Sequence, residues 1–403
     1  MEQQPRTALW TKNFFIVSSV NFFITLIFYL LLVTIAVYAV EEYHASTSQA
    51  GLITGIFIIG TLIGRLFIGR LIDVVGRKKM LFIGLIFFTL TSLLYLVHMG
   101  ITFLLINRFV HGLAFGVAST ATGTIVAQII PAARKGEGIG YYSMSATLAT
   151  AFGPFVGLYM SQHTNFQTIF AFCVAMGVFS LITALFLTVP ELVAPPAKTA
   201  GGQFQLSSFL EPKAIPIAVI TLIVGLCYSS VVSFINFYTM ELDLVSTASF
   251  FFIVYAVAVM VSRPFTGRLM DTKGANHIMY PAFIIMTGGM LLLSQAHSSV
   301  VLLLSGALIG LGFGNMQSTT QAIAVKLTPS HRMGFATSTF FIFLDAGFGF
   351  GPYLLGYVIP LTGYSTMYAM LGIVVLATSA LYYFLYGRTE KEAEAAADVS
   401  ASV

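Results

Sequence analysis

Three ionisable side chains, Arg108, His111 and Asp345, interrupt long apolar stretches of the sequence. Arg108 and His111 are three residues apart, so a helix would place them on one face. A charge inside a membrane costs roughly 2.5–3.5 kcal/mol on insertion scales and usually serves the movement of an ion or a substrate. His111 adds a group that titrates near neutral pH. These residues predict proton transfer or the binding of a charged group.

Each of these residues also has a purely structural interpretation. Arg108 would lie at the outer end of its helix and extend its guanidinium to the membrane interface. Asp345 would form a structural ion pair, or remain protonated and hydrogen-bonded. A sodium site or a site for a substrate amine is a further alternative for Asp345.

The composition indicates that these residues lie in a membrane protein. Of the 403 residues 57% are hydrophobic and 8% are charged, whereas soluble domains carry about 25% charged residues. A span needs roughly 20 mostly apolar residues, and the apolar character surrounds each run instead of forming one stripe. Twelve such runs predict an all-α protein, at residues 14–40, 49–72, 79–98, 101–127, 137–160, 166–189, 214–238, 247–270, 277–296, 299–325, 334–358 and 364–386.

Basic residues predict the orientation of these spans. Every Lys and Arg outside the spans falls on the side of the two termini, whereas the opposite loops carry Glu41, Glu42, Glu241 and Asp243. The excess of positive charge marks the cytoplasmic side. We therefore expect both termini to be cytoplasmic in a multi-pass protein of a bacterial inner membrane. The first run is too long for a cleavable signal peptide and is interpreted as the first span.

Four segments recur at a constant offset of 198 residues without a gap. They are 64–73 with 262–271, 112–116 with 310–314, 131–136 with 329–334, and 153–154 with 351–352. Because six spans is an even number, the two copies enter the membrane in the same direction. The sequence predicts two pseudo-symmetric six-helix bundles at 1–189 and 214–387, a cytoplasmic linker at 190–213 and a disordered cytoplasmic tail at 388–403.

The duplication also separates shared positions from positions found in one copy. Arg108 corresponds to Gly306, His111 to Ile309, and Asp345 to Thr147. A purely architectural role would be expected in both copies. The asymmetry therefore favours a chemical role for these three residues.

The turn between the second and third spans reads Gly69-Arg-Leu-Ile-Asp-Val-Val-Gly-Arg-Lys-Lys. It resembles the G-x-L-x-D-x-x-G-R-[KR]-[KR] signature of the major facilitator superfamily, and the duplication and span count resemble that family along essentially the whole chain. The resemblance implies that Asp73 belongs to a charge cluster that closes the cytoplasmic side of an outward-facing state. The implied cytoplasmic gate comprises Gly69, Asp73, Gly76, Arg77, Gly267 and Asp271. The second copy lacks the basic cluster, so its gate is expected to be weaker.

Two further motifs are similar to those of the same superfamily. Arg108 and Gly112 match an R-x-x-x-G motif whose arginine is linked to proton coupling in the family. Gly153, Pro154 and Gly157 match the core of its antiporter motif, although the chain has Ala149 where the family has a further glycine. Gly351 and Pro352 repeat that core in the eleventh span. A proline with flanking glycines also suits a kinked packing helix.

By the same resemblance, spans 1, 4, 7 and 10 surround the substrate cavity. Polar side chains in these spans indicate either water and substrate or hydrogen bonds between helices. The residues are Asn21, Thr25, Tyr29, Tyr228, Ser233, Asn236, Asn315, Gln317 and Ser318.

The sequence lacks a phosphate-binding G-x-x-x-x-G-K-[ST] loop, a catalytic constellation and metal-ligand spacing. Cys173 and Cys227 are expected to be buried filler. We expect a monomeric transporter, not an enzyme, which binds a small-molecule substrate and protons in a lipid bilayer, without a cofactor, a metal or nucleic acid. Proton-coupled efflux of an amphipathic or hydrophobic compound is the first hypothesis. Uptake or facilitated transport of a sugar, an organic anion or an amino-acid-like compound is the second, and a non-transporting receptor of the same fold is the third.

Overall fold

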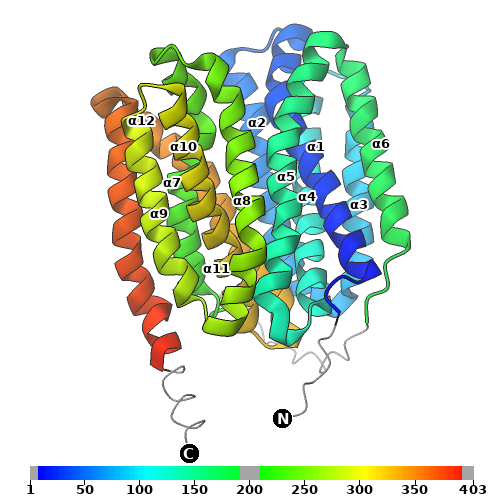
Figure 1. Ribbon diagram of the computed structural model, residues 1–403. Helices are drawn as coiled ribbons and strands as arrows, with labels where there is room; N and C mark the ends of the chain where they lie inside the picture. The colour runs from blue at the N-terminus through cyan, green and yellow to red at the C-terminus, as the bar shows by residue number, and fades with distance from the viewer. Residues whose placement is uncertain (1–7, 191–208, 393–403) are drawn as a thin grey trace, which may run out of the picture. The chain divides into compact units, whose positions relative to one another are not determined.

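The computed structural model describes residues 8–190 and 209–392, and within these ranges the chain is helical without a strand. Figure 1 shows long helices joined by short connections. The first copy forms α1 (Lys12–Tyr43), α2 (Thr47–Val75), α3 (Arg77–Leu94), α4 (Ile101–Ile129), η1 (Ala132–Arg134), α5 (Lys135–His163) and α6 (Phe166–Leu185). The second copy forms α7 (Ile215–Glu241), α8 (Val245–Lys273), α9 (Asn276–Ser294), α10 (Ser299–Ile309), η3 (Gly310–Gly314), α11 (Asn315–Lys326), η4 (Ser330–Arg332), α12 (Met333–Tyr382) and η5 (Tyr383–Gly387).

Twelve helical passes correspond to the twelve predicted runs in the described part of the chain. α10, η3 and α11 follow one another as a single pass with a π-helical turn at Gly310–Gly314. α12 contains two passes, because Gly363 has a φ of 73° and breaks the helix between the eleventh and twelfth runs. Nine described helices are long and apolar enough to cross a membrane, and the last of them contains both passes of α12. The α3 and α5 helices complete the set, so the prediction of an all-α membrane fold is confirmed.

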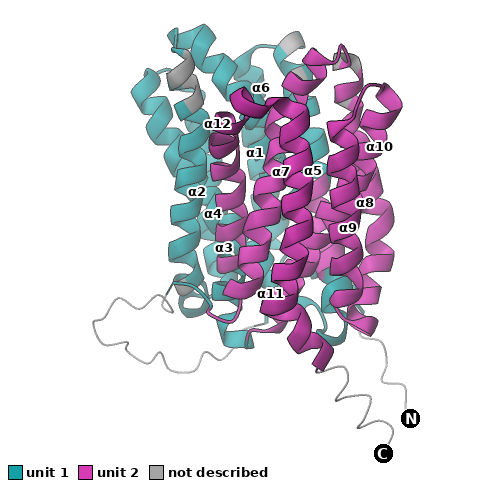
Figure 2. Ribbon diagram, turned by 90° about the vertical axis from the view of Figure 1, so that its left-hand side faces the viewer, with its two compact units in different colours: residues 1–138, 148–211, 329–338 teal, residues 139–147, 212–328, 339–403 magenta. Residues whose placement is uncertain are grey.

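The chain divides into two compact units that do not follow the sequence halves completely. Unit 1 comprises residues 1–138, 148–211 and 329–338, and unit 2 comprises the remainder. Figure 2 colours the two units. Residues 139–147, a segment in the first half of α5, therefore belong to unit 2, and η4 with the start of α12 belongs to unit 1. The boundaries predicted at 189 and 214 do not mark this exchange, because it depends on contacts between segments far apart in sequence.

Two predicted segments lie partly outside the described residues. Residues 191–208 of the linker and 393–403 of the tail are not described. Residues 388–392 are helical, in contrast to the disordered tail expected from Arg388 onward. The Glu390 carboxylate accepts hydrogen bonds from the backbone N–H groups of Ala275 and Asn276, both at 2.8 Å. This carboxylate holds the last described helical turn against the start of α9.

The close approach of α2 and α4 organises unit 1. A Cβ atom added to Gly60 or Gly64 of α2 would lie 2.2 Å from the Phe109 oxygen or 2.5 Å from the Leu113 oxygen. In the opposite direction, a Cβ on Gly112 of α4 would lie 2.0 Å from the Phe57 oxygen. Small residues at such spacing let helix backbones touch. Only glycine fits at these positions without a backbone shift.

Unit 2 keeps the glycines of the fourth-span repeat, Gly310 and Gly314, but not those of its partner helix α8. A Cβ on Gly310 would lie 2.7 Å from the Tyr255 oxygen of α8, and one on Gly314 would lie 2.5 Å from the Val259 side chain. The α8 partners at the repeat positions of Gly60 and Gly64 are Ala258 and Ser262. The duplication thus preserves the helix crossing while changing the residues around it.

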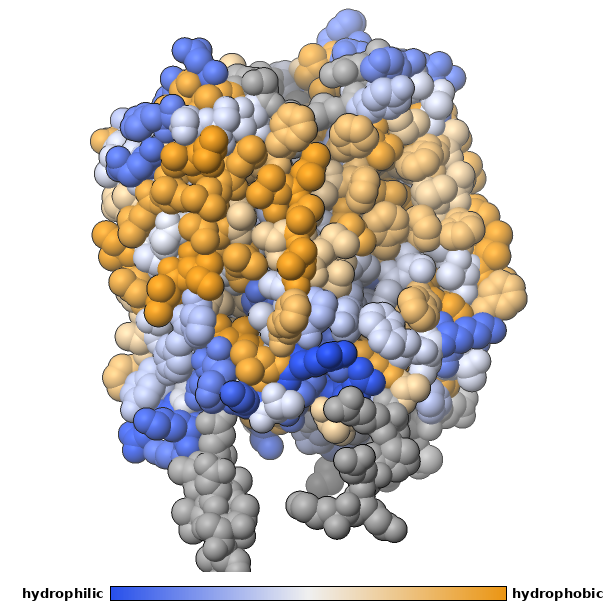
Figure 3. All heavy atoms as spheres, viewed as in Figure 1, coloured by the Kyte–Doolittle hydropathy of each residue, from blue (hydrophilic) through white to orange (hydrophobic). Residues whose placement is uncertain are grey.

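Large apolar side chains cover the outside of the helices. Leu361 is 86% exposed, Phe384 76% and Val300 74%. Figure 3 shows apolar residues gathered over the middle of the helices and hydrophilic residues near their ends. Exposed apolar surface of this extent would aggregate in water and matches a lipid environment.

The α2–α4 contact predicts a sharp difference between two glycines of the same unit. Gly112→Ala should lower the thermal unfolding midpoint of the detergent-purified protein, because the added methyl group forces the backbones apart at a cost of about 1–3 kcal/mol. Gly55→Ala is the control, since a Cβ on Gly55 of α2 meets nothing within 4 Å. Equal midpoints for the two variants would contradict the packing described for α2 and α4.

Candidate functional site

Arg108 lies fully buried inside unit 1, at 0% exposure. Its Nε donates to the Ile53 carbonyl of α2 at 3.3 Å, and its Nη1 donates to the Tyr95 hydroxyl at 3.5 Å. The guanidinium carbon lies 4.5 Å from the centre of the Phe57 ring, a distance at which an aromatic face attracts a cation. Nη2 has no hydrogen-bond partner among the described residues. The interpretation of Arg108 as an arginine extending to the interface is therefore wrong.

His111 joins Arg108 through a shared hydroxyl. The Tyr95 hydroxyl lies 3.0 Å from His111 Nδ1, and the Ser92 hydroxyl lies 3.4 Å from Nε2. The imidazole is also fully buried and packs 4.3 Å from the Phe88 ring centre. The sequence prediction that Arg108 and His111 lie together is confirmed. We refer to Ser92, Tyr95, Arg108 and His111 as the α3–α4 polar cluster.

The helix packing keeps this cluster in place. Asn107, one residue before Arg108, donates its side-chain N–H to the Thr91 carbonyl of α3 at 3.0 Å. The Thr61 hydroxyl of α2 donates to the Gly112 carbonyl at 3.0 Å, one residue after His111. The cluster is thus held on both sides by hydrogen bonds to backbone carbonyls.

Asp345 lies in unit 2 and is half-buried in α12. Its repeat counterpart, Thr147, also belongs to unit 2, where its hydroxyl donates to the Ser143 carbonyl of α5 at 3.2 Å. Arg108 and His111 belong to unit 1. Of the three residues selected from the sequence, Arg108 and His111 therefore lie in unit 1 and Asp345 lies in unit 2.

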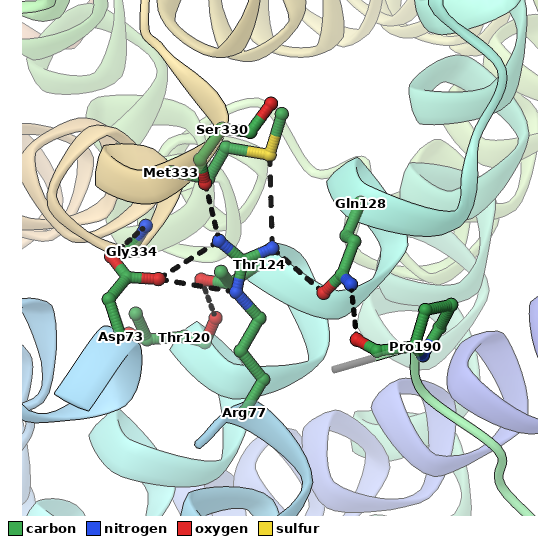
Figure 4. Close-up of polar contacts among 9 residues, drawn as sticks. All are labelled: Asp73, Arg77, Thr120, Thr124, Gln128, Pro190, Ser330, Met333 and Gly334. Atoms are coloured by element: carbon green, nitrogen blue, oxygen red, sulfur yellow. Dashed lines mark hydrogen bonds and ion pairs between the residues drawn. The ribbon is translucent and has the colours of Figure 1, made fainter. Parts of the chain in front are cut away.

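The turn between α2 and α3 forms a second polar site, shown in Figure 4. Asp73 Oδ1 accepts from Arg77 Nη2 at 2.9 Å, and Asp73 Oδ2 accepts from the Gly334 N–H at 3.2 Å. Arg77 also donates to the Gln128 side chain at 2.8 Å and to the Ser330 carbonyl at 2.7 Å. Gly76, with a φ of 104°, makes the turn that brings Asp73 and Arg77 together. We refer to this group as the Asp73 network.

The charge of Asp73 depends on its partners. Asp73 lies beyond Leu52–Gly69, the apolar window of α2. Burial raises the pKa of its carboxyl, and the Arg77 guanidinium and the Gly334 N–H oppose that rise. The side chain of Arg77 is only 5% exposed, so the pair is shielded from solvent. Removing one member would leave the other charge buried without compensation.

The second copy of this turn neutralises its acid differently. Asp271 pairs with Lys326 of α11 at 3.0 Å. Lys326 occupies the repeat position of Gln128, and the counterpart of Arg77 is Ala275. The basic partner is thus supplied by the start of α3 in the first copy and by the end of α11 in the second. Whether this turn is a weaker gate stays a prediction.

The remaining gate and kink glycines lie where helices cross closely. A Cβ on Gly69 would lie 2.9 Å from the Ser338 Cβ, and one on Gly153 would lie 2.6 Å from the Tyr29 Cβ. A Cβ on Gly351 would lie 2.0 Å from the Ser229 hydroxyl oxygen of α7. The remaining residues of these two groups, namely Gly157, Pro154, Pro352 and Gly267, lie in α5, α12 and α8. Gly69, Gly153 and Gly351 therefore lie at close helix contacts, which fits the interpretation of kinked packing helices.

In unit 1, the residues predicted to line a cavity lie mostly inside the helix bundle. Asn21 and Thr25 are buried, and Asn21 accepts a hydrogen bond from the Thr122 hydroxyl of α4 at 3.3 Å. Tyr29 is half-buried and packs against Gly153. Asn21 thus connects α1 to α4. A cavity role for these residues stays a prediction.

In unit 2, Asn315 connects α8 to α11. Its Oδ1 accepts from the Thr266 hydroxyl at 2.8 Å, and its Nδ2 donates to the Ser262 hydroxyl at 3.0 Å. Tyr228 stacks on Phe313 with ring centres 4.0 Å apart. Ser318 is buried, Gln317 and Ser233 are half-buried, and Asn236 is exposed. Of this set, Asn315 fits the alternative of polar contacts between helices.

Several important residues of the two sites were not predicted from the sequence. Gln128, Ser330 and Gly334 complete the Asp73 network, and Tyr95 joins Arg108 to His111. The repeat offered one usable signal, since Gln128 and Lys326 occupy equivalent positions. Gln128 contacts Arg77, the partner of Asp73, and Lys326 contacts Asp271 directly. Nothing in the spacing of Tyr95 distinguished it from the other tyrosines.

Comparison with known proteins identifies relatives over most of the chain. The family model described as Major Facilitator Superfamily matches residues 17–346. An uncharacterised MFS-type transporter of Methanocaldococcus jannaschii is 24% identical over 86% of this chain and 91% of its own length. Multidrug resistance protein 1 of Bacillus subtilis is 24% identical over 83% of this chain and 87% of its own length. The solved structure of a proton:xylose symporter has a TM-score of 0.74 at 14% identity, covering 93% of this chain and 96% of that one.

The Asp73 network predicts a strongly coupled pair. Arg77→Ala should destabilise the protein by about 3–5 kcal/mol, because it leaves the Asp73 carboxylate buried without its cation. The double variant Asp73→Ala/Arg77→Ala should recover part of that loss in denaturant unfolding. Lys79→Ala, at an exposed position of the same turn, is the control and should resemble the wild type. Strict additivity of the two single changes would show that Asp73 and Arg77 do not depend on each other.

Proposed function

Because the chain belongs to the major facilitator superfamily, a family of multi-pass membrane transporters, we propose that it exports an amphipathic organic solute by proton-coupled antiport. The two sequence halves, as parallel repeats of one ancestral bundle, carry out alternating access. Both termini lie in the cytoplasm and the protein resides in a bacterial inner membrane. The concentration of basic residues on one side of the predicted spans supports this orientation.

The α3–α4 polar cluster is the observation that carries the proposal of proton coupling. A permanent cation, Arg108, and a titratable imidazole, His111, contact the same Tyr95 hydroxyl in a site without exposure to solvent. Protonation of His111 places a second positive charge beside Arg108. Like charges repel strongly where water is excluded. Proton arrival therefore disturbs the hydrogen bonds that hold α3 to α4.

Asp345 is proposed as the residue that carries the proton. It is an acid within an apolar helix of the second half, and ionisable residues in such positions serve proton and ion movement. Neutralisation of the carboxylate lowers the cost of moving it through a low-dielectric environment. Arg108 and His111 then adjust the proton affinity of the transporter or bind the anionic part of a substrate.

The Asp73 network is proposed as the cytoplasmic gate. Asp73 and Arg77 form a buried ion pair within the α2–α3 turn, and each makes a hydrogen bond to the backbone of residues 330–334 in the second sequence half. Such a connection stabilises one arrangement of the two sequence halves over others. Separation of Ser330 and Gly334 from Arg77 and Asp73 would open that side.

The direction of transport distinguishes this proposal of export from the alternative, the uptake of a defined metabolite. Export is supported by a relative named as a multidrug resistance protein. The second candidate, uptake or facilitated transport of a sugar, an organic anion or an amino-acid-like compound, is favoured by one feature of the sequence. No Asp or Glu lies deep within predicted spans 1 to 6, where Glu137 stands at the first residue of span 5, although drug pumps usually hold an acid in the N-terminal bundle.

The role of Asp345 predicts loss of coupling on neutralisation. In proteoliposomes, Asp345→Asn should abolish accumulation driven by a proton gradient while preserving exchange of solute across the membrane. Asp243→Asn is the matched control, because Asp243 is exposed in a loop with a φ of 55°, which asparagine also tolerates. Proton-driven accumulation by Asp345→Asn at the wild-type rate would remove Asp345 from this role.

The role of His111 predicts a change in pH dependence. His111→Gln keeps hydrogen-bonding atoms near Tyr95 and Ser92 but cannot acquire a proton between pH 5 and 8. Its initial transport rate should vary less with pH than that of the wild type. The measurement is the pH profile of transport in proteoliposomes with equal pH on both sides. An unchanged profile would exclude His111 as a titrating group in transport.

A further inference from the structure

Arg263 in α8 is buried, and its guanidinium has no hydrogen-bond partner among the described residues. It is 1% exposed, and Nε, Nη1 and Nη2 have no hydrogen-bond partner among the described residues. No ion pair involves Arg263 in the same part of the chain. A guanidinium keeps its charge at all relevant pH values and offers several N–H donors. Buried charges in proteins are normally paired, so this side chain has unused capacity for an anion.

Two other deeply buried cations, Arg108 and Arg77, contrast with Arg263. Arg108 donates to the Ile53 carbonyl and contacts the Tyr95 hydroxyl and the Phe57 ring. Arg77 has the Asp73 carboxylate. Arg108 is therefore integrated into the fixed interior of unit 1 with most of its guanidinium engaged. Arg263 is the better candidate for binding a group that comes from outside the protein.

The surroundings of Arg263 are less filled than those of its repeat counterpart, Arg65. Next to Arg65, the Ser338 hydroxyl donates to the Arg65 carbonyl, and Ser338 packs tightly on Gly69. In unit 2 the position of Ser338 is taken by Gly140. A Cβ on Gly140 would meet only the Arg263 Cδ and the Gly267 Cα, both at 3.9 Å. One copy thus fills this crossing with a serine, and the other leaves it lined by glycines.

The polar side chains nearest along the two helices are already engaged in hydrogen bonds within the protein. On α8, Ser262 and Thr266 are engaged with Asn315. On α5, Ser143 lies one turn after Gly140 and donates to the Gly140 carbonyl at 2.8 Å. The Ser143 hydrogen is therefore committed to the Gly140 carbonyl, so the Arg263 guanidinium is left to supply the hydrogen-bond donors for a ligand at this crossing. The described residues of these two helix segments place no acid against Arg263.

We propose that Arg263 binds the carboxylate of an amphipathic organic acid at the crossing of α5 and α8. This inference rests on the proposed transport function and specifies the class of solute. A guanidinium and a carboxylate form two parallel hydrogen bonds of matching geometry. One arginine supplies one positive charge, so a monoanion leaves the site neutral. A phosphate dianion would leave excess negative charge in a water-poor region.

The test compares acids with their amides on the full-length protein in detergent. The probes are benzoate with benzamide and indole-3-acetate with indole-3-acetamide, at about pH 7.5, where carboxylic acids are ionised. Inorganic phosphate and sulfate are added as separate anions. In the wild type, at least one acid should raise the thermal unfolding midpoint in a saturable manner, and its amide should not. Stabilisation by phosphate or sulfate alone would overturn the assignment to a carboxylate.

Variants locate the binding to Arg263. Arg263→Gln should raise the half-saturating acid concentration on the order of tenfold or more, because it removes hydrogen bonds to a charged group. Arg263→Lys keeps the charge without the planar fork and should be intermediate. Arg388→Gln is the matched control, since Arg388 is exposed and pairs with Glu392, and it should behave as the wild type.

Gly140→Ser offers a test that keeps the charge of Arg263. It introduces the side chain found at the equivalent crossing of unit 1 and should weaken acid binding by occupying the space. Without ligand, Arg263→Gln should unfold at or above the wild-type midpoint, because an unpaired buried charge destabilises the protein that contains it. A lower midpoint, or failure to fold, would indicate a structural ion pair and overturn the proposal.

The outcomes separate this inference from the proposed function. Acid binding that depends on Arg263, together with transport that ignores the proton gradient, would retain the inference and reject proton coupling. Proton-driven transport of neutral or cationic compounds, with no acid stabilising the wild type, would retain the transport function and overturn the role of Arg263. Equal acid binding by Arg263→Gln and the wild type would also overturn it.

Discussion

The backbone contact between α2 and α4 is the constraint on which the candidate proton site depends. Glycines on both helices remove the side chains that would otherwise separate them. The carbonyl of Ile53 and the face of Phe57 consequently come within reach of Arg108. In a membrane interior, a guanidinium can be retained only where such acceptors are already in position. Close packing and buried charge are therefore parts of one arrangement in unit 1.

Unit 2 shows what the same crossing becomes without the charge. The counterpart of Arg108 is Gly306, and a Cβ there would lie 3.0 Å from the Phe251 ring. Tyr255 stands where unit 1 has Phe57, and Phe313 where it has Phe115. Aromatic packing thus occupies the space that the α3–α4 polar cluster fills in the first copy. The duplication supplied two equal scaffolds, and substitutions at a few buried positions made them chemically different.

The same principle applies where the charges are shared by both copies. Asp73 and Asp271 are equivalent acids, but one is neutralised by Arg77 of the next helix and the other by Lys326 of a neighbouring helix. Arg65 and Arg263 are equivalent arginines beside a serine and a glycine respectively. A buried charge requires compensation but not a particular partner. Differences in how each copy compensates its charges distinguish the residues that support the fold from those available to a ligand.

Sequence alone determined the membrane class, the twelve passes, the six-plus-six duplication and the pairing of Arg108 with His111. These features follow from local hydropathy, a constant repeat offset and helical spacing, all of which are properties of short stretches of chain. Tertiary structure decided that Tyr95 bridges Arg108 and His111, and that Ser330 and Gly334 reach the Asp73 network. It also decided that the Arg263 guanidinium has no hydrogen-bond partner in the described part of the chain. Hydrogen bonds act over about 3 Å, and residues that distant segments bring within that range cannot be identified from their order along the chain.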